Sequence, residues 1–221
     1  MREPGERVTG IRPDPRRPDR FLVERDGLPW LKLSAARVVE LGLSVGEPLT
    51  EERRATIEQA ATLDAALDAG LRLLAVRPRS EAELRRRLQQ KRFAPSVVEQ
   101  VLARLRSLGY LDDRAFAESW IRQRRALNPR GASALRRELR SKGVAPELID
   151  ACVPDDPVSE LAAAREVVEK HRKRFQALDA RTAERRLAGV LSRRGFSWSV
   201  IRTVLLESGF SPETTDDVSA E

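Results

Sequence analysis

The chain has 221 residues, with 41 Lys and Arg against 34 Asp and Glu but only one His and one Cys. This length suits one or two domains with a sizeable core, whereas a single Cys and a single His exclude a disulfide framework, an iron–sulfur cluster and the usual zinc site. No uncharged apolar run approaches the roughly 20 residues of a membrane helix, and the N-terminus lacks the apolar core of a signal peptide, so we expect a cytoplasmic protein with no metal and no cofactor.

Residues 1–60 are predicted to form a small β module with a short helix. Short runs of strand-forming residues are separated by turn residues, and Asp26-Gly27 is a strong hairpin signal because glycine accepts the positive φ of a type I′ turn. The expected elements are strands at Val8–Ile11, Arg20–Arg25 and Leu28–Leu33, a loop at Arg12–Asp19, and a helix capped by Ser34 and closed by Gly42. Such a module is marginal alone, so we expect it to pack on the following residues.

From about residue 61 to 210 the chain repeats itself with a period of 51–52 residues, the signature of a tandem-repeat architecture. Nine columns stay in register over three copies. The columns of the first copy are Leu84, Leu88, Lys91, Phe93, Pro95, Val97, Val98, Val101 and Leu102; those of the second are Leu135, Leu139, Lys142, Val144, Pro146, Leu148, Ile149, Cys152 and Val153; those of the third are Leu187, Leu191, Arg194, Phe196, Trp198, Val200, Ile201, Val204 and Leu205.

Each repeat is predicted to be three helices. In the first, an apolar-periodic helix covers Thr62–Val76, a capping box at Ser80–Glu83 starts a second helix, and Pro95 starts a third that ends at Gly109. The expected fold is mainly α: three tandem three-helix repeats in an elongated array after an N-terminal β-hairpin module. We assign the repeats to residues 61–111, 112–153 and 154–210, followed by an acidic tail at 211–221.

No catalytic constellation is evident. The chain lacks a phosphate-binding glycine loop. His171, among cations, reads as a solvated residue of a charged face rather than a general base, and Cys152 as a small core residue. The pair Asp112-Asp113 reads as helix-cap residues rather than as paired catalytic carboxylates. We therefore expect a protein that is not an enzyme.

The cations suggest a binding surface. Counted by segment, the net charge is zero over residues 1–60, +5 over 61–111, +3 over 112–153, +3 over 154–210 and −4 over 211–221. Each cation has two interpretations, solubility with local ion pairs or contact with an acidic partner. The candidate contacts lie on the second helices and at the repeated basic column: Arg85, Arg86, Lys91, Arg136, Arg137, Lys142, Arg185, Arg186 and Arg194. The few aromatic residues, Tyr110, Trp120 and Trp198 among them, stand at apolar positions and are expected in the core rather than on a base-stacking platform.

The chain contains the segment Gly-Tyr-Leu-Asp-Asp-x-x-Phe-Ala, which includes Tyr110, Asp112, Asp113 and Phe116. It also contains a repeated pattern that begins with Ser80, Glu83 and Leu84 and continues to Lys91 and Phe93. These motifs closely resemble the RecX family, regulators of the RecA recombinase. The resemblance covers roughly residues 62–210. One departure is Arg92, where the pattern usually has Gly, which affects a turn.

The resemblance implies a cytoplasmic, mainly inhibitory regulator that binds the RecA–single-stranded DNA filament in its groove and acts in homologous recombination, DNA repair and the SOS response. We expect a monomer; weak direct binding to single- or double-stranded DNA is compatible with that role. Two alternatives stay open: a helix-turn-helix-like regulator acting on duplex DNA, and a different acidic protein partner.

Overall fold

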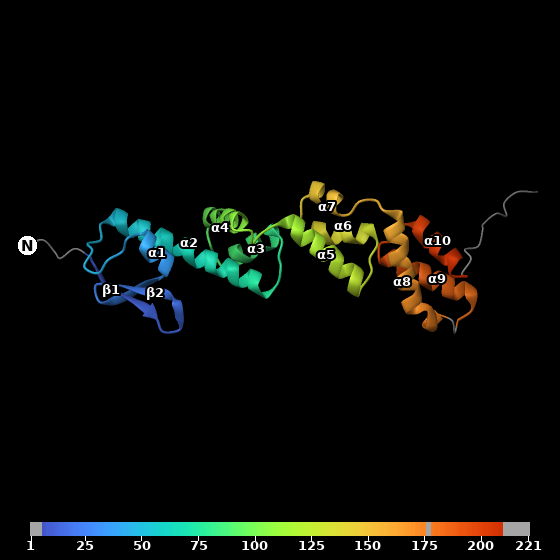
Figure 1. Ribbon diagram of the computed structural model, residues 1–221, viewed down its shortest axis with the longest axis horizontal. Helices are drawn as coiled ribbons and strands as arrows, with labels where there is room; N and C mark the ends of the chain where they lie inside the picture. Colours follow the sequence, from blue (N-terminus) through green and yellow to red (C-terminus); the bar gives the residue numbers. More distant parts are fainter. Residues whose placement is uncertain (1–5, 176–177, 210–221) are drawn as a thin grey trace, which may run out of the picture. The chain divides into compact units, whose positions relative to one another are not determined.

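The computed structural model describes residues 6–175 and 178–209, and it divides into two compact units, residues 1–111 and 112–221 (Figure 1). The first unit holds a small antiparallel sheet and four helices, and the second holds six helices, all within the described residues. The expected acidic tail lies outside those residues. In the part described, no helix combines the length and the apolar character needed to cross a membrane.

The N-terminal module is a three-stranded antiparallel sheet in the order β1 (Val8–Asp14), β2 (Arg17–Arg25) and β3 (Leu28–Ser34). The β2–β3 hairpin turns at Asp26 and Gly27, whose φ angles of 50° and 79° are those of the predicted type I′ turn. Ser34 caps the short helix α1 (Ala35–Glu40), as expected, by accepting a hydrogen bond from the Arg37 N–H.

The predicted loop at Arg12–Asp19 is wrong, since most of it is strand. Pro13 lies in β1, which is an edge strand, and an edge position tolerates the missing N–H. Asp14 is buried and accepts a hydrogen bond from Lys32 of β3 at 2.6 Å. This cross-sheet partner cannot be seen in the local sequence.

Helix α2 (Glu51–Val76) is longer than predicted, since it begins after its cap Thr50 rather than at Thr62. Its first half contributes Ile57 to the core of the sheet, and its second half contributes Ala66 and Ala69 to the core of the first repeat. One continuous helix therefore serves both cores.

The sheet is fastened to α2 by a buried ion pair. Arg20 of β2 donates to Asp64 at 2.9 Å, and the Ser34 N–H and hydroxyl donate to the same carboxylate at 2.7 and 2.9 Å. Arg17 binds Asp68 one turn further along through two hydrogen bonds of 2.8 and 2.9 Å. Because both arginines come from the sheet, they determine where it sits on the helix.

The first repeat adds α3 (Glu81–Gln90) and α4 (Pro95–Ser107) to the second half of α2. Leu84, Leu88 and Leu102 are fully buried, as the repeat columns predict. Arg92 has a φ of 67°, the left-handed conformation that its counterparts Gly143 and Gly195 also adopt. The departure from the family pattern thus falls on a turn that favours glycine.

The second repeat consists of α5 (Asp113–Leu127), α6 (Ala132–Ser141) and α7 (Pro146–Cys152). Its core contains Phe116, Leu135, Leu139 and Ile149.

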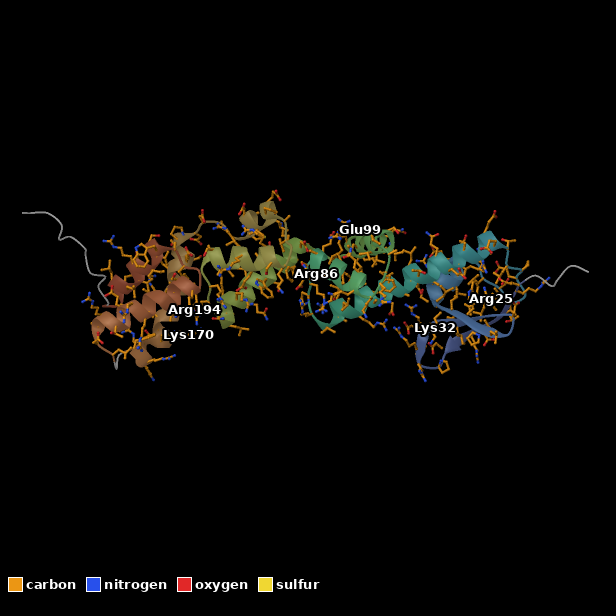
Figure 2. The ribbon with its side chains drawn as sticks, turned by 180° about the vertical axis from the view of Figure 1, so that it is seen from behind. Arg25, Lys32, Arg86, Glu99, Lys170 and Arg194 are labelled. Atoms are coloured by element: carbon orange, nitrogen blue, oxygen red, sulfur yellow. The ribbon has the colours of Figure 1, made fainter. Side chains whose placement is uncertain are left out.

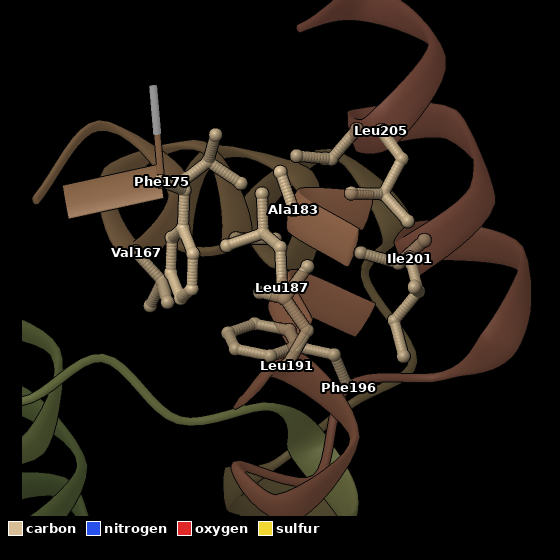
Figure 3. Close-up of a cluster of buried hydrophobic side chains, with 12 residues drawn as sticks. Val167, Phe175, Ala183, Leu187, Leu191, Phe196, Ile201 and Leu205 are labelled. Atoms are coloured by element: carbon tan, nitrogen blue, oxygen red, sulfur yellow. The ribbon is translucent and has the colours of Figure 1, made fainter. Parts of the chain in front are cut away.

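The third repeat consists of α8 (Pro157–Phe175), α9 (Ala180–Arg193) and α10 (Trp198–Glu207). Figure 3 shows how Leu187 and Leu191 of α9 pack against Val167 and Phe175 of α8 and Ile201 of α10. The expectation of three tandem three-helix repeats after a small β module is confirmed.

Two aromatic residues expected in the core are on the surface. Tyr110 is 60% exposed and Trp198 is 66% exposed. Trp198 is the first residue of α10, where Pro95 and Pro146 stand in the other repeats, and a first-turn position there points away from the core. Tyr110 follows Gly109 at the end of α4, where its N–H closes the helix on the Leu105 carbonyl.

Candidate partner-binding surface

The second helix of each repeat presents its arginines outward. Leu84 and Leu88 of α3 are fully buried, as are Leu139 of α6 and Leu191 of α9. Because these leucines recur at i, i+4 spacing, they place one face of the helix in the core. The arginines between them lie on the remaining faces of the helix. Some of these arginines form ion pairs with neighbouring carboxylates, and others do not.

Arg86 and Arg137 are free cations in the same repeat column. Both are exposed, and neither forms an ion pair within residues 6–175 and 178–209; Figure 2 labels Arg86 on α3. Lys91, at the end of α3, is exposed as well and has no carboxylate partner in the same described residues. Arg86 also lines a small hollow of about 150 Å³, whose other lining residues are Arg77, Arg79, Glu83, Arg87 and Gln90.

Arg85, the direct neighbour of Arg86, forms ion pairs within the fold. Its guanidinium donates to Glu99 of α4 at 2.7 Å and to Glu81 at 2.8 Å. The hydrogen bonds that Arg85 donates to Glu99 raise the pKa of Arg85 and lower the pKa of Glu99. Arg85 therefore holds α3 to α4; Figure 2 labels Glu99.

Arg136, in the corresponding column of the second repeat, also forms an ion pair within the fold. It donates at 2.7 Å both to the Val153 carbonyl and to Asp155, on the segment between α7 and α8. It thereby ties α6 to the chain that leads into the third repeat.

Arg194, at the end of α9, joins the second and third repeats. Its guanidinium donates to the Asn128 side chain at 2.8 Å and to the Pro129 carbonyl at 3.4 Å. Burial, with the nearby charge of Arg130, lowers the pKa of Arg194. This arginine is placed for repeat packing, and we leave it out of the proposed surface.

Lys142 lies over an aromatic ring. Its Nζ is 4.8 Å from the centroid of Trp120, and the Arg124 guanidinium carbon is 4.4 Å from the same centroid. The Trp120 indole N–H donates to Glu138 at 2.9 Å. Because the ring is half-buried and engaged by two cations, it is not available for stacking on a base.

Arg185 and Arg186 of α9 are exposed and have no carboxylate within ion-pair distance in the described part of the chain. They line a pocket together with Arg174 and Arg193. Arg174 and Arg193 are not among the predicted contacts, because an average of charge over a whole repeat hides their segment; a count over a shorter window reveals it.

The residues that carry the sequence motifs have structural roles. Ser80 is fully buried and accepts a hydrogen bond from the Glu83 N–H as the cap of α3. Asp112 caps α5 by accepting from the Arg114 and Ala115 N–H groups, and Asp113 is the first residue of that helix. Asp112 is thus a helix cap, as expected, whereas Asp113 lies in the first turn of the helix.

The two remaining chemical candidates are poorly placed for catalysis. Cys152 is half-buried, and burial raises the pKa of its thiol, which disfavours the reactive thiolate. His171, expected to be solvated, is instead half-buried: its Nδ1 lies 2.8 Å from the Val167 carbonyl and its ring stacks on Phe175. Among the described residues, no three or more His, Cys, Asp or Glu side chains gather as a metal site would require.

Comparison with known families matches all three repeats. The models described as the first, second and third three-helix domains of RecX match residues 66–105, 112–153 and 159–205, respectively.

Individual relatives and solved structures agree. The chain is 32% identical over 196 residues to a regulatory protein RecX from Geobacillus kaustophilus, which spans 87% of this chain and 73% of that protein. It is 44% identical to a regulatory protein RecX from Trichlorobacter lovleyi over 61% of this chain and 89% of that protein. A crystal structure of a regulatory protein RecX has the same fold, with a TM-score of 0.72 at 24% identity over 90% of this chain and 98% of that one.

Proposed function

The chain belongs to the RecX family of regulatory proteins, and from that premise we propose that it regulates RecA, mainly as an inhibitor, by binding the RecA–single-stranded DNA filament in its groove. In this role the chain is a binding protein and not an enzyme. We propose that it acts in the cytoplasm as a monomer, within recombinational DNA repair and the SOS response.

The observation that carries this proposal is the recurrence of free cations from repeat to repeat. Arg86 and Arg137 occupy the same column of two repeats, and both are exposed without an ion pair in the described chain. The third repeat contributes Arg185 and Arg186. Cations that recur along tandem repeats suit a partner that is itself periodic, because weak contacts add through effective concentration.

Contacts of this kind explain inhibition without catalysis. A chain bound across successive RecA protomers would hinder the ATPase cycle, growth of the filament, and strand exchange with a second duplex. Lys91 and Lys142 lie at the ends of α3 and α6, in one column of the first two repeats.

The proposal is tested by charge reversal at two repeats. The variant Arg86→Glu/Arg137→Glu removes two free cations and disrupts no ion pair described above. We expect the concentration that half-inhibits the single-stranded-DNA-dependent ATPase of RecA to rise at least about tenfold, which corresponds to about 1.4 kcal/mol of binding free energy.

The matched control is Arg104→Glu/Arg122→Glu, which makes the same charge change at exposed positions of α4 and α5. Inhibition that stays intact in the Arg86/Arg137 variant at both low and moderate salt would refute the proposal. The alternative of direct regulation on duplex DNA predicts a steep salt dependence with naked DNA and no gain in affinity when RecA coats a single strand.

A further inference from the structure

The net charge of the chain is concentrated in one short segment. Residues 170–194 contain nine Lys and Arg against two Asp and Glu, a net charge of +7 that equals the net charge of all 221 residues. Residues 154–169 contain five acids and one base, so an average over the whole third repeat hides this segment. It runs from the end of α8 through α9.

This segment forms a pocket of about 510 Å³ in the third repeat. Its charged lining consists of Arg174 from α8 and of Arg185, Arg186 and Arg193 from α9, and His171 completes the polar lining. No acidic side chain is among the described residues that line it. Four guanidinium groups therefore line one pocket, and none of its other described lining residues carries a carboxylate.

The absence of ion pairs here contrasts with other arginines of the chain. Arg85 and Arg165 each lie within 2.8 Å of a carboxylate oxygen. Within residues 6–175 and 178–209, none of the four pocket arginines has a carboxylate within ion-pair distance. The carboxylate of Asp179 caps α9 by accepting from the Thr182 N–H at 2.9 Å. This hydrogen bond, and to a smaller extent the charge of Arg185, lowers the pKa of Asp179.

A glycine and a fixed histidine shape the pocket. A Cβ atom at Gly189 would lie 3.2 Å from the Nη1 of Arg193, so glycine leaves room for that guanidinium against the helix. Helix interiors favour alanine over glycine, so the glycine at position 189 indicates a need for space beside the helix, where the Arg193 guanidinium lies. His171 donates through Nδ1 to the Val167 carbonyl and stacks on Phe175, so its ring is held in place at the wall of the pocket.

We propose that this pocket binds a compact group of phosphates, two or more phosphoryl groups close together, as in a triphosphate or in successive phosphates of a nucleic-acid strand. Guanidinium groups bind phosphate oxygens in pairs of parallel hydrogen bonds. A volume of about 510 Å³ lies within the range of small-ligand sites. The half-buried Leu178 and Val190 form the apolar side of the pocket and give the attached organic group a surface to pack on.

The test measures binding of inorganic tripolyphosphate to the full chain by titration calorimetry, in the absence of RecA. The pocket variant Arg185→Ala/Arg186→Ala is compared with Arg122→Ala/Arg125→Ala, which removes the same charge from exposed positions of α5. We expect the pocket variant to lose at least about tenfold in affinity, since each charge-assisted hydrogen bond contributes substantially to binding, and the control to change by less than about twofold.

A second variant separates binding from folding. Gly189→Ala is expected to raise the urea midpoint of unfolding, because alanine favours the helix, and to weaken tripolyphosphate binding, because it crowds Arg193. A defect of folding would instead lower both the urea midpoint and the affinity for tripolyphosphate.

Two results would overturn the proposal: no binding by the natural chain, or an equal loss in both double variants. Competition distinguishes the sources of the phosphates: displacement of tripolyphosphate by ATP at lower concentration than by an oligothymidylate indicates a nucleotide, and the reverse order indicates a strand. Because RecA is absent, failure here leaves the ATPase test of the proposed function unaffected.

Discussion

Two glycines bring the backbones of the second and third repeats together, and Gly131→Ala is the sharpest test of that contact. A Cβ atom at Gly131 would lie 2.2 Å from the Gly195 carbonyl oxygen and 2.4 Å from its carbon. These are backbone atoms, which cannot rotate away as a side chain can. The φ of −72° and ψ of 162° at Gly131 suit alanine, so the whole effect comes from the clash.

The expected loss of stability follows from the backbone shift that the added methyl group requires. Relieving the overlap shifts the Gly195 backbone away from α6, and overpacking of this kind costs about 1–3 kcal/mol. The same shift loosens the bond from the Gly131 N–H to the Arg194 carbonyl at 3.0 Å and that from the Ser133 hydroxyl to the Gly195 carbonyl at 2.7 Å. Losing one of them adds about 0.5–1.5 kcal/mol, so we expect Gly131→Ala to lower the free energy of unfolding by about 2–4 kcal/mol.

The assay is urea unfolding followed by tryptophan fluorescence in a Trp30→Phe background. The remaining tryptophans, Trp120 and Trp198, both lie in the second unit, which contains the contact. Gly189→Ala is the matched control, since it makes the same substitution in the same unit at a helix-interior position where stability is expected to rise. A loss of less than about 0.5 kcal/mol in Gly131→Ala would refute the close backbone contact between these repeats.

Three further substitutions test the first unit by urea unfolding. Asp64→Ala leaves the buried Arg20 without its carboxylate and is expected to cost about 3–5 kcal/mol; a loss below about 1 kcal/mol would contradict the role of this pair. The hydrogen bond from Arg17 lowers the pKa of Asp68, so this carboxylate stabilises the fold above its unfolded pKa of about 3.9 and loses that effect as the pH falls through its folded pKa. Asp68→Asn is therefore expected to destabilise at pH 7, and the difference from the natural chain should shrink by pH 3; a constant difference would argue against the ion pair. Arg92→Gly relieves a left-handed φ of 67° and is expected to raise the free energy of unfolding by about 0.5–1 kcal/mol, with unchanged or lower stability as the contrary result.

The repeat columns predicted the cores because they record burial directly. Leu84, Leu135 and Leu187 stand in one column and are at most 2% exposed. The method fails where a column records backbone geometry instead. Trp198 shares a column with two prolines that begin helices, so that column marks the first turn of a helix and says nothing about burial.

The extent of α2 could not be predicted from its periodicity, because its two halves face different cores. Ile57 packs on the sheet, whereas Ala66 and Ala69 pack on α3 and α4. A single apolar stripe is expected only for a helix with one neighbour. The change of partner along α2 made its first half look like part of a separate module.

For the candidate surface, the sequence indicated which residues are cationic and outward, but not which are free. Arg85 and Arg86 are adjacent on α3, yet only Arg85 is bound, because Glu99 approaches it from α4. That carboxylate lies 14 residues away in the chain and comes close only through the packing of α3 on α4. A count of cations therefore sets an upper bound on a binding surface, and the fold removes those that its own acids neutralise.

The same reasoning explains why the third repeat differs from the others. In the first two repeats an acid pairs with the first arginine of the second helix, through Glu99 and Asp155, whereas the next arginine, Arg86 or Arg137, has no ion pair within residues 6–175 and 178–209. In the third repeat, Gly189 stands in the column of Arg86 and Arg137, and the acids of the repeat are concentrated before residue 170. Shared core columns thus keep one scaffold in all three repeats, while separation of acids from bases along the chain leaves the third with a concentrated positive charge.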